Sequence, residues 1–225
     1  MVIPRKIHYI WLGSKGFTGL QYKCINSWKI YLPEKDWQYY LWNEETLPEE
    51  VKNHPYVKKM TAHGKWSYVS DFIRFWALER YGGIYFDTDV ELLKPFDSFL
   101  NNHSFVGTSS SGQIESAVIG AMPHAKFLQS ALGHYTGHTE DNTGDLGPSV
   151  LADAVKHTDE QVKIYTFKYF YPFAFGEKFS KKLVNNETHA IHWWDYSWGS
   201  PFARMLIKLH LYKIAVAIKR VISKK

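Results

Sequence analysis

The sequence predicts an α/β fold built on a mainly parallel sheet with helices on its flanks. Residues 6–13 and 37–42 are short apolar runs typical of buried strands, and the helical pattern of residues 19–32 joins them before Pro33. A strand–helix–strand unit of this kind makes its two strands parallel through a right-handed crossover. With 225 residues, 45% of them hydrophobic, the chain can bury a sizeable core within one domain.

The rest of the chain continues this alternation. Residues 43–61 are polar and contain prolines, which predicts short helices and loops, and residues 90–96 predict an edge-like extended segment. Further strands are expected at residues 102–108, 114–121 and 162–167, and further helices at residues 125–135 and 148–155. His8 lies near the start of the first strand, so we expect it to be a packed residue and not a ligand.

The most informative segment runs from Ser70 to Val90. Its first half is helical, because apolar residues recur at the spacing of one helix face: Val69, Phe72, Ile73 and Trp76. Gly82 and Gly83 end this helix, since glycine readily adopts the conformation of a C-terminal cap. The apolar residues 84–86 that follow predict a buried strand.

Two carboxylates, Asp87 and Asp89, follow that strand directly. If the backbone stays extended, their side chains lie on the same side, because side-chain directions alternate along a strand. Two oxygen ligands at this spacing suit Mg²⁺ or Mn²⁺, and ligands of open α/β sheets bind beyond the carboxyl ends of the strands. An isolated Asp-x-Asp is more often a turn with solvated acids, so the motif needs supporting context.

That context is specific. Ser-Asp-x-x-Arg at residues 70–74 precedes Tyr-Gly-Gly-Ile-Tyr-x-Asp-x-Asp at residues 81–89. The combined pattern resembles the DXD glycosyltransferases with a GT-A fold, in the sugar-binding-region family of capsular-polysaccharide transferases and Golgi mannosyltransferases. The large glucosylating bacterial toxins share this core. The resemblance implies a GT-A domain over residues 1–202, a bound Mn²⁺ or Mg²⁺ ion, and a nucleotide diphosphate sugar as donor.

The same resemblance assigns roles to individual residues. Ile-His-x-Ile-Trp at the start of the family's fold matches residues 7–11, so the Trp11 ring is expected to stack on the nucleotide base. The implied donor-binding residues are Ile10, Trp11, Leu12, Ser70, Asp71, Arg74, Tyr85, Asp87, Thr88, Asp145, Gly147 and Trp198. The implied catalytic residues are Asp71, Arg74, Asp87 and Asp89. For Asp71 and Arg74, the alternative is an ion pair between neighbouring turns of one helix.

Two later segments complete the expected site. The family's His-x-x-x-x-Ser-Trp near the C-terminus matches His192, Ser197 and Trp198. The match implies a further metal ligand, with His192 as the first choice and Ser197 as the second. A histidine beside tryptophans is otherwise more often a packing residue. The family's Thr-Gly-Pro turn corresponds here to residues 146–148, Leu-Gly-Pro, in which leucine replaces the threonine. Asp145 is either a sugar contact or a turn acid.

The charge distribution argues against a nucleic-acid partner. The formal net charge is +5, but residues 204–225 carry seven Lys or Arg and no acid, so removing them leaves the rest at −2. An apolar helical stripe runs through this tail: Ile207, Leu211, Ile214, Ile218 and Val221. We therefore expect residues 203–225 to form a basic amphipathic helix on an anionic membrane surface, or, alternatively, to pack on the core or on a second subunit.

The expected location is the cytoplasm, at the inner face of the membrane. The single Cys24 fits a reducing compartment, no run of residues is apolar enough to span a membrane, and no secretory signal is evident at the N-terminus.

The expected function is that of a retaining, metal-dependent glycosyltransferase, where "retaining" comes from the resemblance alone. It would move a hexose from a nucleotide diphosphate sugar, UDP favoured over GDP, to a glycan or lipid-linked sugar in surface polysaccharide synthesis. One alternative is a non-catalytic sugar-nucleotide or glycan-binding module on the same fold. A metal-dependent phosphoesterase or nucleotidyltransferase would usually bring a denser acid and histidine cluster or a glycine-rich phosphate loop after the first strand, and neither is evident.

Overall fold

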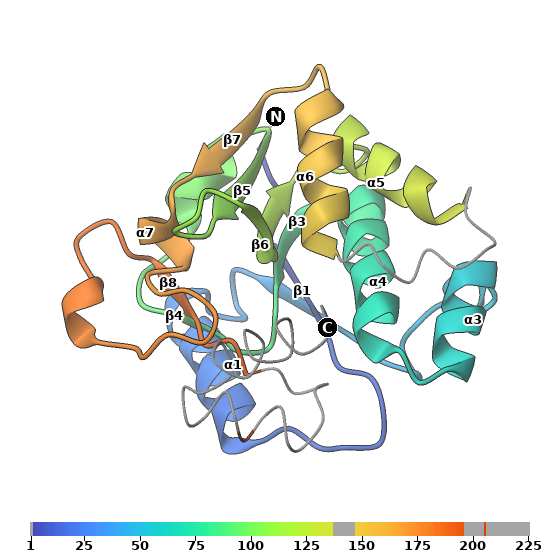
Figure 1. The fold of residues 1–225 in the computed structure, drawn as a ribbon, viewed down its shortest axis with the longest axis horizontal. Coiled ribbons are helices and arrows are strands. Elements are labelled where there is room, and N and C mark those ends of the chain that lie inside the picture. The colour runs from blue at the N-terminus through green and yellow to red at the C-terminus, as the bar shows by residue number, and fades with distance from the viewer. Residues whose placement is uncertain (1, 137–146, 196–204, 206–225) are drawn as a thin grey trace, which may run out of the picture.

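The computed structural model describes residues 2–136, 147–195 and 205, and its centre is a six-stranded sheet in the order β2-β1-β3-β6-β5-β7 (Figure 1). The strands are β1 (Lys6–Ile10), β2 (Gln38–Trp42), β3 (Gly83–Phe86), β5 (Ser104–Thr108), β6 (Ile114–Ala121) and β7 (Val162–Tyr165). Strand β6 is antiparallel to both of its neighbours, and the other five strands run in one direction. The predicted α/β fold with a mainly parallel sheet is therefore confirmed.

Helices cover both faces of this sheet (Figure 1). A hydrophobic core lies between the sheet and the helices on each face. The helices are α1 (Gly19–Tyr31), α2 (Glu49–Lys52), α3 (Pro55–Ala62), α4 (Trp66–Tyr81), α5 (Lys126–Thr136), α6 (Gly147–His157) and α7 (Phe167–Phe170), with short 3-10 turns at Asp97–Asn101 and Lys181–Leu183. Helices α3 to α6 build one core and α1 and α7 build the other. Because side chains alternate across a strand, Tyr85 packs in the first core while Ile84 and Phe86 pack in the second.

A second, two-stranded sheet consists of β4 (Val90–Leu92) and β8 (Ala190–His192). The predicted extended segment at residues 90–96 thus begins with a strand that does not join the main sheet. Its partner lies about one hundred residues further along the chain, and the local pattern of residues carries no information on such a pairing. Within the described residues, no helix combines the length and the apolar character that crossing a lipid bilayer requires.

The glycine pair after α4 is needed where β3 approaches β1. Gly82 has φ +57° and Gly83 has φ +115°, a region that side chains other than glycine rarely adopt. A Cβ atom on Gly83 would lie 2.5 Å from the carbonyl oxygen of Lys6. The predicted glycine turn therefore ends the helix and also permits the close contact that places β3 beside β1.

His8 is fully buried in β1, and both of its ring nitrogens have partners. Its Nε2–H donates to the carbonyl oxygen of Gly82 at 2.9 Å, and its Nδ1 accepts from the indole N–H of Trp42 at 3.2 Å. These partners suit the neutral imidazole, and burial lowers the pKa of His8 from 6.5 to about 4. His8 is thus a packed residue, as expected.

We expect the protein to lose stability as the pH falls from about 6.5 to about 4, because the unfolded chain then binds a proton at His8 that the folded protein excludes. A pKa lowered from 6.5 to about 4 corresponds to about 3 kcal/mol over this window. Urea unfolding of the wild type and of His8→Gln measures the effect, since the stability advantage of the wild type should shrink as the pH falls. Parallel pH curves for the two proteins would contradict it.

Candidate functional site

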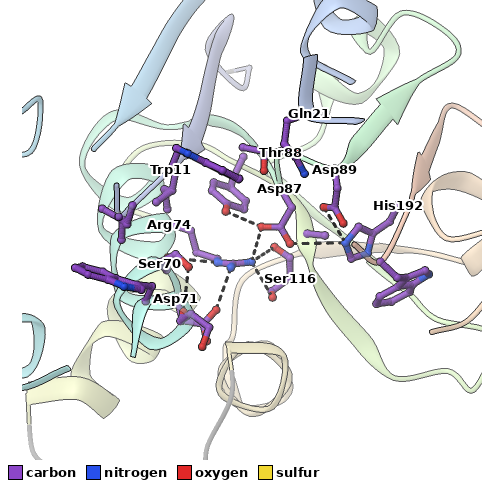
Figure 2. Close-up of a pocket in the computed structure, with 18 of the residues that line it drawn as sticks. Trp11, Gln21, Ser70, Asp71, Arg74, Asp87, Thr88, Asp89, Ser116 and His192 are labelled. Carbon is purple, nitrogen blue, oxygen red and sulfur yellow. Dashed lines mark hydrogen bonds and ion pairs between the residues drawn. The ribbon is translucent and has the colours of Figure 1, made fainter. Parts of the chain in front are cut away.

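A cavity of about 660 Å³ lies beyond the carboxyl ends of β1 and β3 (Figure 2). Most of the predicted site residues line it: Ile10, Trp11, Leu12, Ser70, Asp71, Arg74, Tyr85, Asp87, Thr88, Asp89 and His192. Gly147 does not line the cavity but contacts Asp71, which does. Asp145, Ser197, Trp198 and the tail from residue 203 lie outside the described residues, apart from Met205.

The two motif carboxylates lie on a turn and not on an extended strand. Strand β3 ends at Phe86, and the backbone N–H of Val90 donates to the carbonyl oxygen of Asp87 at 3.0 Å. The extended backbone on which the expected same-side arrangement depended is therefore not present at Asp87 and Asp89. The carboxylates converge all the same, because both turn toward the His192 imidazole (Figure 2).

His192 completes a compact group of three possible metal ligands. Its Nε2 lies 3.2 Å from Oδ1 of Asp89 and 3.9 Å from Oδ2 of Asp87. One ligand atom from each residue lies within 4.8 Å of the other two. Carboxylate oxygens with an imidazole nitrogen are a donor set that Mn²⁺ or Mg²⁺ accepts, so these residues fit a divalent ion.

The small sheet brings His192 to this position. Val90 pairs with His192 in the β4–β8 ladder, and the next residue, Trp193, donates its N–H to the carbonyl oxygen of Asp89 at 3.0 Å. The backbone N–H of Asp195 donates to Oδ2 of Asp89 at 2.7 Å. The chain after β8 therefore holds the Asp89 carboxylate as well as presenting the histidine.

The imidazole and the carboxylates of this group shift one another's pKa values. Burial lowers the pKa of His192, but the carboxylates of Asp89 and Asp87 more than offset burial, so the pKa is raised overall. For Asp89, burial raises the pKa, and the imidazole together with the Asp195 N–H brings it below its ordinary value. Opposite charges in one buried group thus keep Asp89 ionised.

Arg74 is buried in the floor of the cavity and connects two carboxylates. Its guanidinium lies 3.0 Å from Oδ1 of Asp71 and 3.3 Å from Oδ1 of Asp87, and it donates to the carbonyl and hydroxyl oxygens of Ser116 (Figure 2). The Tyr85 hydroxyl also donates to Oδ1 of Asp87, at 2.7 Å. The structure thus contains the intrahelical ion pair that was the alternative interpretation, and Arg74 also orients Asp87.

Asp71 links helix α4 to the start of α6. Burial raises its pKa, against the effects of Arg74 and of the backbone N–H of Gly147, which donates to Oδ2 at 2.8 Å. A Cβ atom on Gly147 would overlap the Asp71 carboxylate. The glycine of the Leu-Gly-Pro segment therefore lets α6 approach the Asp71–Arg74 pair.

We expect Gly147→Ala to lower the free energy of unfolding by about 1–3 kcal/mol and to reduce turnover, because the methyl group displaces Asp71 and, through it, Arg74. Gly133→Ala in α5 is the matched control. An added Cβ there meets no atom within 4 Å, so the variant should be as stable as the wild type or slightly more stable. Thermal unfolding and donor turnover of both variants check this, and equal stability of the two would contradict it.

Trp11 lies just after β1 at the edge of the cavity. Its ring packs against Phe17 with centroids 4.8 Å apart, and its indole N–H donates to the carbonyl oxygen of Lys15 at 2.5 Å. The ring is only half-buried, and it lines the cavity. These contacts orient the ring and leave part of its surface for a planar ligand.

Several residues of the site were not predicted. Glu115 and Ser116 line the cavity from β6, whose predicted range included them without indicating where the strand lies. Gln21 is almost fully buried, accepts from the backbone N–H of Thr18 at 3.1 Å and donates to Oδ2 of Asp195 at 3.2 Å. The Thr-x-x-Gln spacing of a helix capping box is the signal that could have drawn attention to Gln21.

Comparison with known proteins finds a family model that matches part of this chain. The model described as "glycosyltransferase sugar-binding region containing DXD motif" matches residues 20–106. Inositol phosphoceramide mannosyltransferase 3 of Schizosaccharomyces pombe is 30% identical over 135 residues, which cover 56% of this chain and 36% of that protein. Alpha-1,4-N-acetylglucosaminyltransferase of Homo sapiens is 24% identical over 157 residues, which cover 60% of this chain and 45% of that protein. This chain thus spans less than half the length of either relative.

A solved structure shares the fold. A glycosyltransferase involved in the glycosylation of the major capsid of PBCV-1 matches with a TM-score of 0.52 at 15% identity, over 92% of this chain and 99% of that one. The range matched by the family model contains the Ser-Asp-x-x-Arg helix and the Asp87–Asp89 turn, but not Trp11 or His192. The resemblance seen in the sequence is confirmed, because residues 20–106 match the model of glycosyltransferases whose sugar-binding region contains the DXD motif.

Proposed function

We propose that this protein is a retaining, metal-dependent glycosyltransferase that moves a hexose from a nucleotide diphosphate sugar to a glycan or lipid-linked acceptor. The observation that carries the proposal is the convergence of Asp87, Asp89 and His192 beside a cavity large enough for such a donor. A divalent ion held by these three residues would supply positive charge to the diphosphate as it leaves.

The protein's own residues have separate tasks in this proposal. Arg74 and Tyr85 hold the Asp87 carboxylate in place, and the Asp195 N–H does the same for Asp89. Trp11 stacks on the base at the far end of the donor. The bond between the sugar carbon and the diphosphate oxygen breaks with its electron pair going to the diphosphate. The acceptor oxygen then bonds to that carbon from the same face and passes its proton to the diphosphate, so no protein nucleophile is needed.

Donor and acceptor are proposed at the level of class. The names of the two relatives specify mannosyl and N-acetylglucosaminyl transfer, which supports a hexose or its N-acetyl derivative. One relative is named for a phosphoceramide acceptor, which supports a lipid-linked acceptor for this chain. We favour UDP as the donor nucleotide and surface polysaccharide synthesis as the pathway. We also retain the proposal that residues 203–225 contact an anionic membrane at the inner face, where a lipid-linked acceptor would be located.

A screen of UDP- and GDP-sugars tests the proposed function. Purified protein with Mn²⁺ should release nucleoside diphosphate from one class of donor, faster with acceptor present, and EDTA should stop the release. A non-catalytic binding module is the alternative function. It would bind the same donors, as measured by calorimetry, without releasing nucleoside diphosphate under any condition.

We expect Trp11→Ala to raise the donor KM and to leave kcat nearly unchanged. Stacking of a base on an aromatic ring contributes about 1–3 kcal/mol, which corresponds to roughly a 5- to 150-fold change in KM. The contact is distant from the reacting carbon, so it should stabilise ground state and transition state equally. Trp11→Phe, which keeps a ring, is the control and should raise the donor KM less. A collapse of kcat at constant KM would assign Trp11 another role.

A further inference from the structure

Glu115 on β6 (Ile114–Ala121) is a carboxylate of the site to which the proposed function gives no task. Strand β6 pairs with β3 up to Phe86 and Val118, and the backbone N–H of Asp87 donates to the carbonyl oxygen of Ala117 at 2.9 Å. Strand β6 then continues past the end of β3. Glu115 therefore lies beside the Asp87–Asp89 turn and lines the cavity.

An irregularity in the sheet directs this end of β6 toward the cavity. The pairing of β5 with β6 jumps from Val106–Ile119 to Gly107–Glu115, which leaves residues 116–118 without partners in β5. The hydroxyl of the fully buried Tyr171 accepts the freed backbone N–H of Val118 at 2.9 Å. Bulges bend a strand and redirect its side chains, and they are frequent next to active sites.

Gly107 makes this arrangement possible on the β5 side. A Cβ atom on Gly107 would lie 2.7 Å from the Phe170 ring and 2.8 Å from the Tyr171 ring. The glycine thus admits Tyr171 beside the bulge. Two strands and a buried tyrosine from a third segment together fix the backbone that carries Glu115.

The charges lining the cavity set Glu115 apart. Asp71 and Asp87 share Arg74, and Asp89 pairs with His192. Within the described part of the chain, no Lys, Arg or His forms an ion pair with Glu115. Burial raises the pKa of Glu115, and the His192 imidazole that acts against burial already pairs with Asp89. A partly buried carboxylate without an ion pair of its own is costly unless a ligand brings positive charge.

We propose that Glu115 contacts the transferred sugar and that its carboxylate stabilises the positive charge that develops on the sugar ring as the diphosphate leaves. This inference rests on the proposed function. Breaking the bond to the diphosphate gives the ring carbon and ring oxygen oxocarbenium character. A preorganised negative charge in a water-poor site interacts with that developing charge more strongly than a solvated one.

Glu115→Gln tests the inference, because it removes the charge and keeps the size and one side-chain oxygen of Glu115. We expect kcat for donor hydrolysis and for sugar transfer to fall together by about 10²–10³-fold. The donor KM and the affinity for nucleoside diphosphate alone should stay within about threefold of the wild type. Glu34→Gln, at an exposed position after α1, is the matched control and should change neither quantity.

Each other outcome overturns the inference. A kcat within threefold of the wild type, or a raised KM with unchanged kcat, shows that the charge of Glu115 does not act in the transition state. A loss of transfer with undiminished hydrolysis makes Glu115 an acceptor-side residue. If Glu115→Gln unfolds at a lower temperature, Glu115→Asp decides, because the retained charge must then give the higher kcat. Wild-type protein that releases nucleoside diphosphate from no donor refutes the proposed function itself, whereas an active wild type with an active Glu115→Gln refutes this inference alone.

Discussion

Asp89→Ala should abolish metal-dependent turnover and the binding of nucleoside diphosphate, and Asp89→Asn should lower turnover by about a thousandfold or more. The carboxylate of Asp89 belongs to the converging group of three possible metal ligands, accepts the Asp195 N–H and faces the His192 imidazole. Asparagine keeps an oxygen for the Asp195 N–H but loses the charge. Because His192 can release its proton when its partner is neutral, we expect the Asn variant to remain folded.

Three measurements check the effect of the Asp89 variants: turnover as a function of Mn²⁺ concentration, Mn²⁺ binding by electron paramagnetic resonance, and thermal unfolding without metal. Asp159→Asn is the matched control, since Asp159 is an exposed carboxylate that pairs with Lys126 and does not line the cavity. It should match the wild type in all three. Mn²⁺-dependent turnover that persists undiminished in Asp89→Ala would refute the proposal that the Asp87–Asp89 turn binds the metal.

Arg74→Ala should destabilise the protein by about 3–5 kcal/mol and remove turnover as well. Removing one partner of a buried ion pair leaves the other charge uncompensated, and here two carboxylates, Asp71 and Asp87, lose the same cation. The Ser116 carbonyl also loses its donor. Arg74→Lys keeps the charge, but a single ammonium group lacks the planar fork that reaches all three partners. The stability and turnover of this variant should therefore lie between those of the alanine variant and the wild type.

A double-mutant cycle identifies the cause of the Arg74 effect. If repulsion from uncompensated charge dominates, Asp71→Asn in the Arg74→Ala background should recover part of the lost stability, although Asp71→Asn alone should be destabilising. Urea unfolding at neutral pH gives the four free energies. A loss below about 1 kcal/mol in Arg74→Ala would mean that the guanidinium is not needed to hold these carboxylates.

The helix from Trp66 to Tyr81, the glycine turn and strand β3 could be predicted from the sequence because local patterns encode them. Apolar spacing specifies which face of the helix is buried, and only glycine readily adopts the φ angles at residues 82 and 83. The family could be recognised for the same reason, since its motif is contiguous over residues 70–89. The parallel start of the sheet followed from the short strand–helix–strand unit.

The family motif predicted more residues of the site than local structural patterns alone could. Matching Trp11 and His192 to the ends of the family pattern predicted two residues that the structure brings to the same cavity as Asp87 and Asp89. Their proposed roles remain to be measured. Asp145, Ser197 and Trp198 stay predictions as well, since they lie outside the described residues.

Only the tertiary structure decided how these residues meet. The contact of His192 with Asp89 depends on the pairing of β4 with β8, and the placement of Glu115 depends on the bulge between β5 and β6. The turn at Asp87, where the sequence suggested an extended strand, is part of the same arrangement. Local patterns specify which face of a segment is apolar, but the partner of a strand is chosen by packing between residues far apart in the chain. The chemistry of the site was therefore readable in its residue types, whereas its geometry came from long-range pairing.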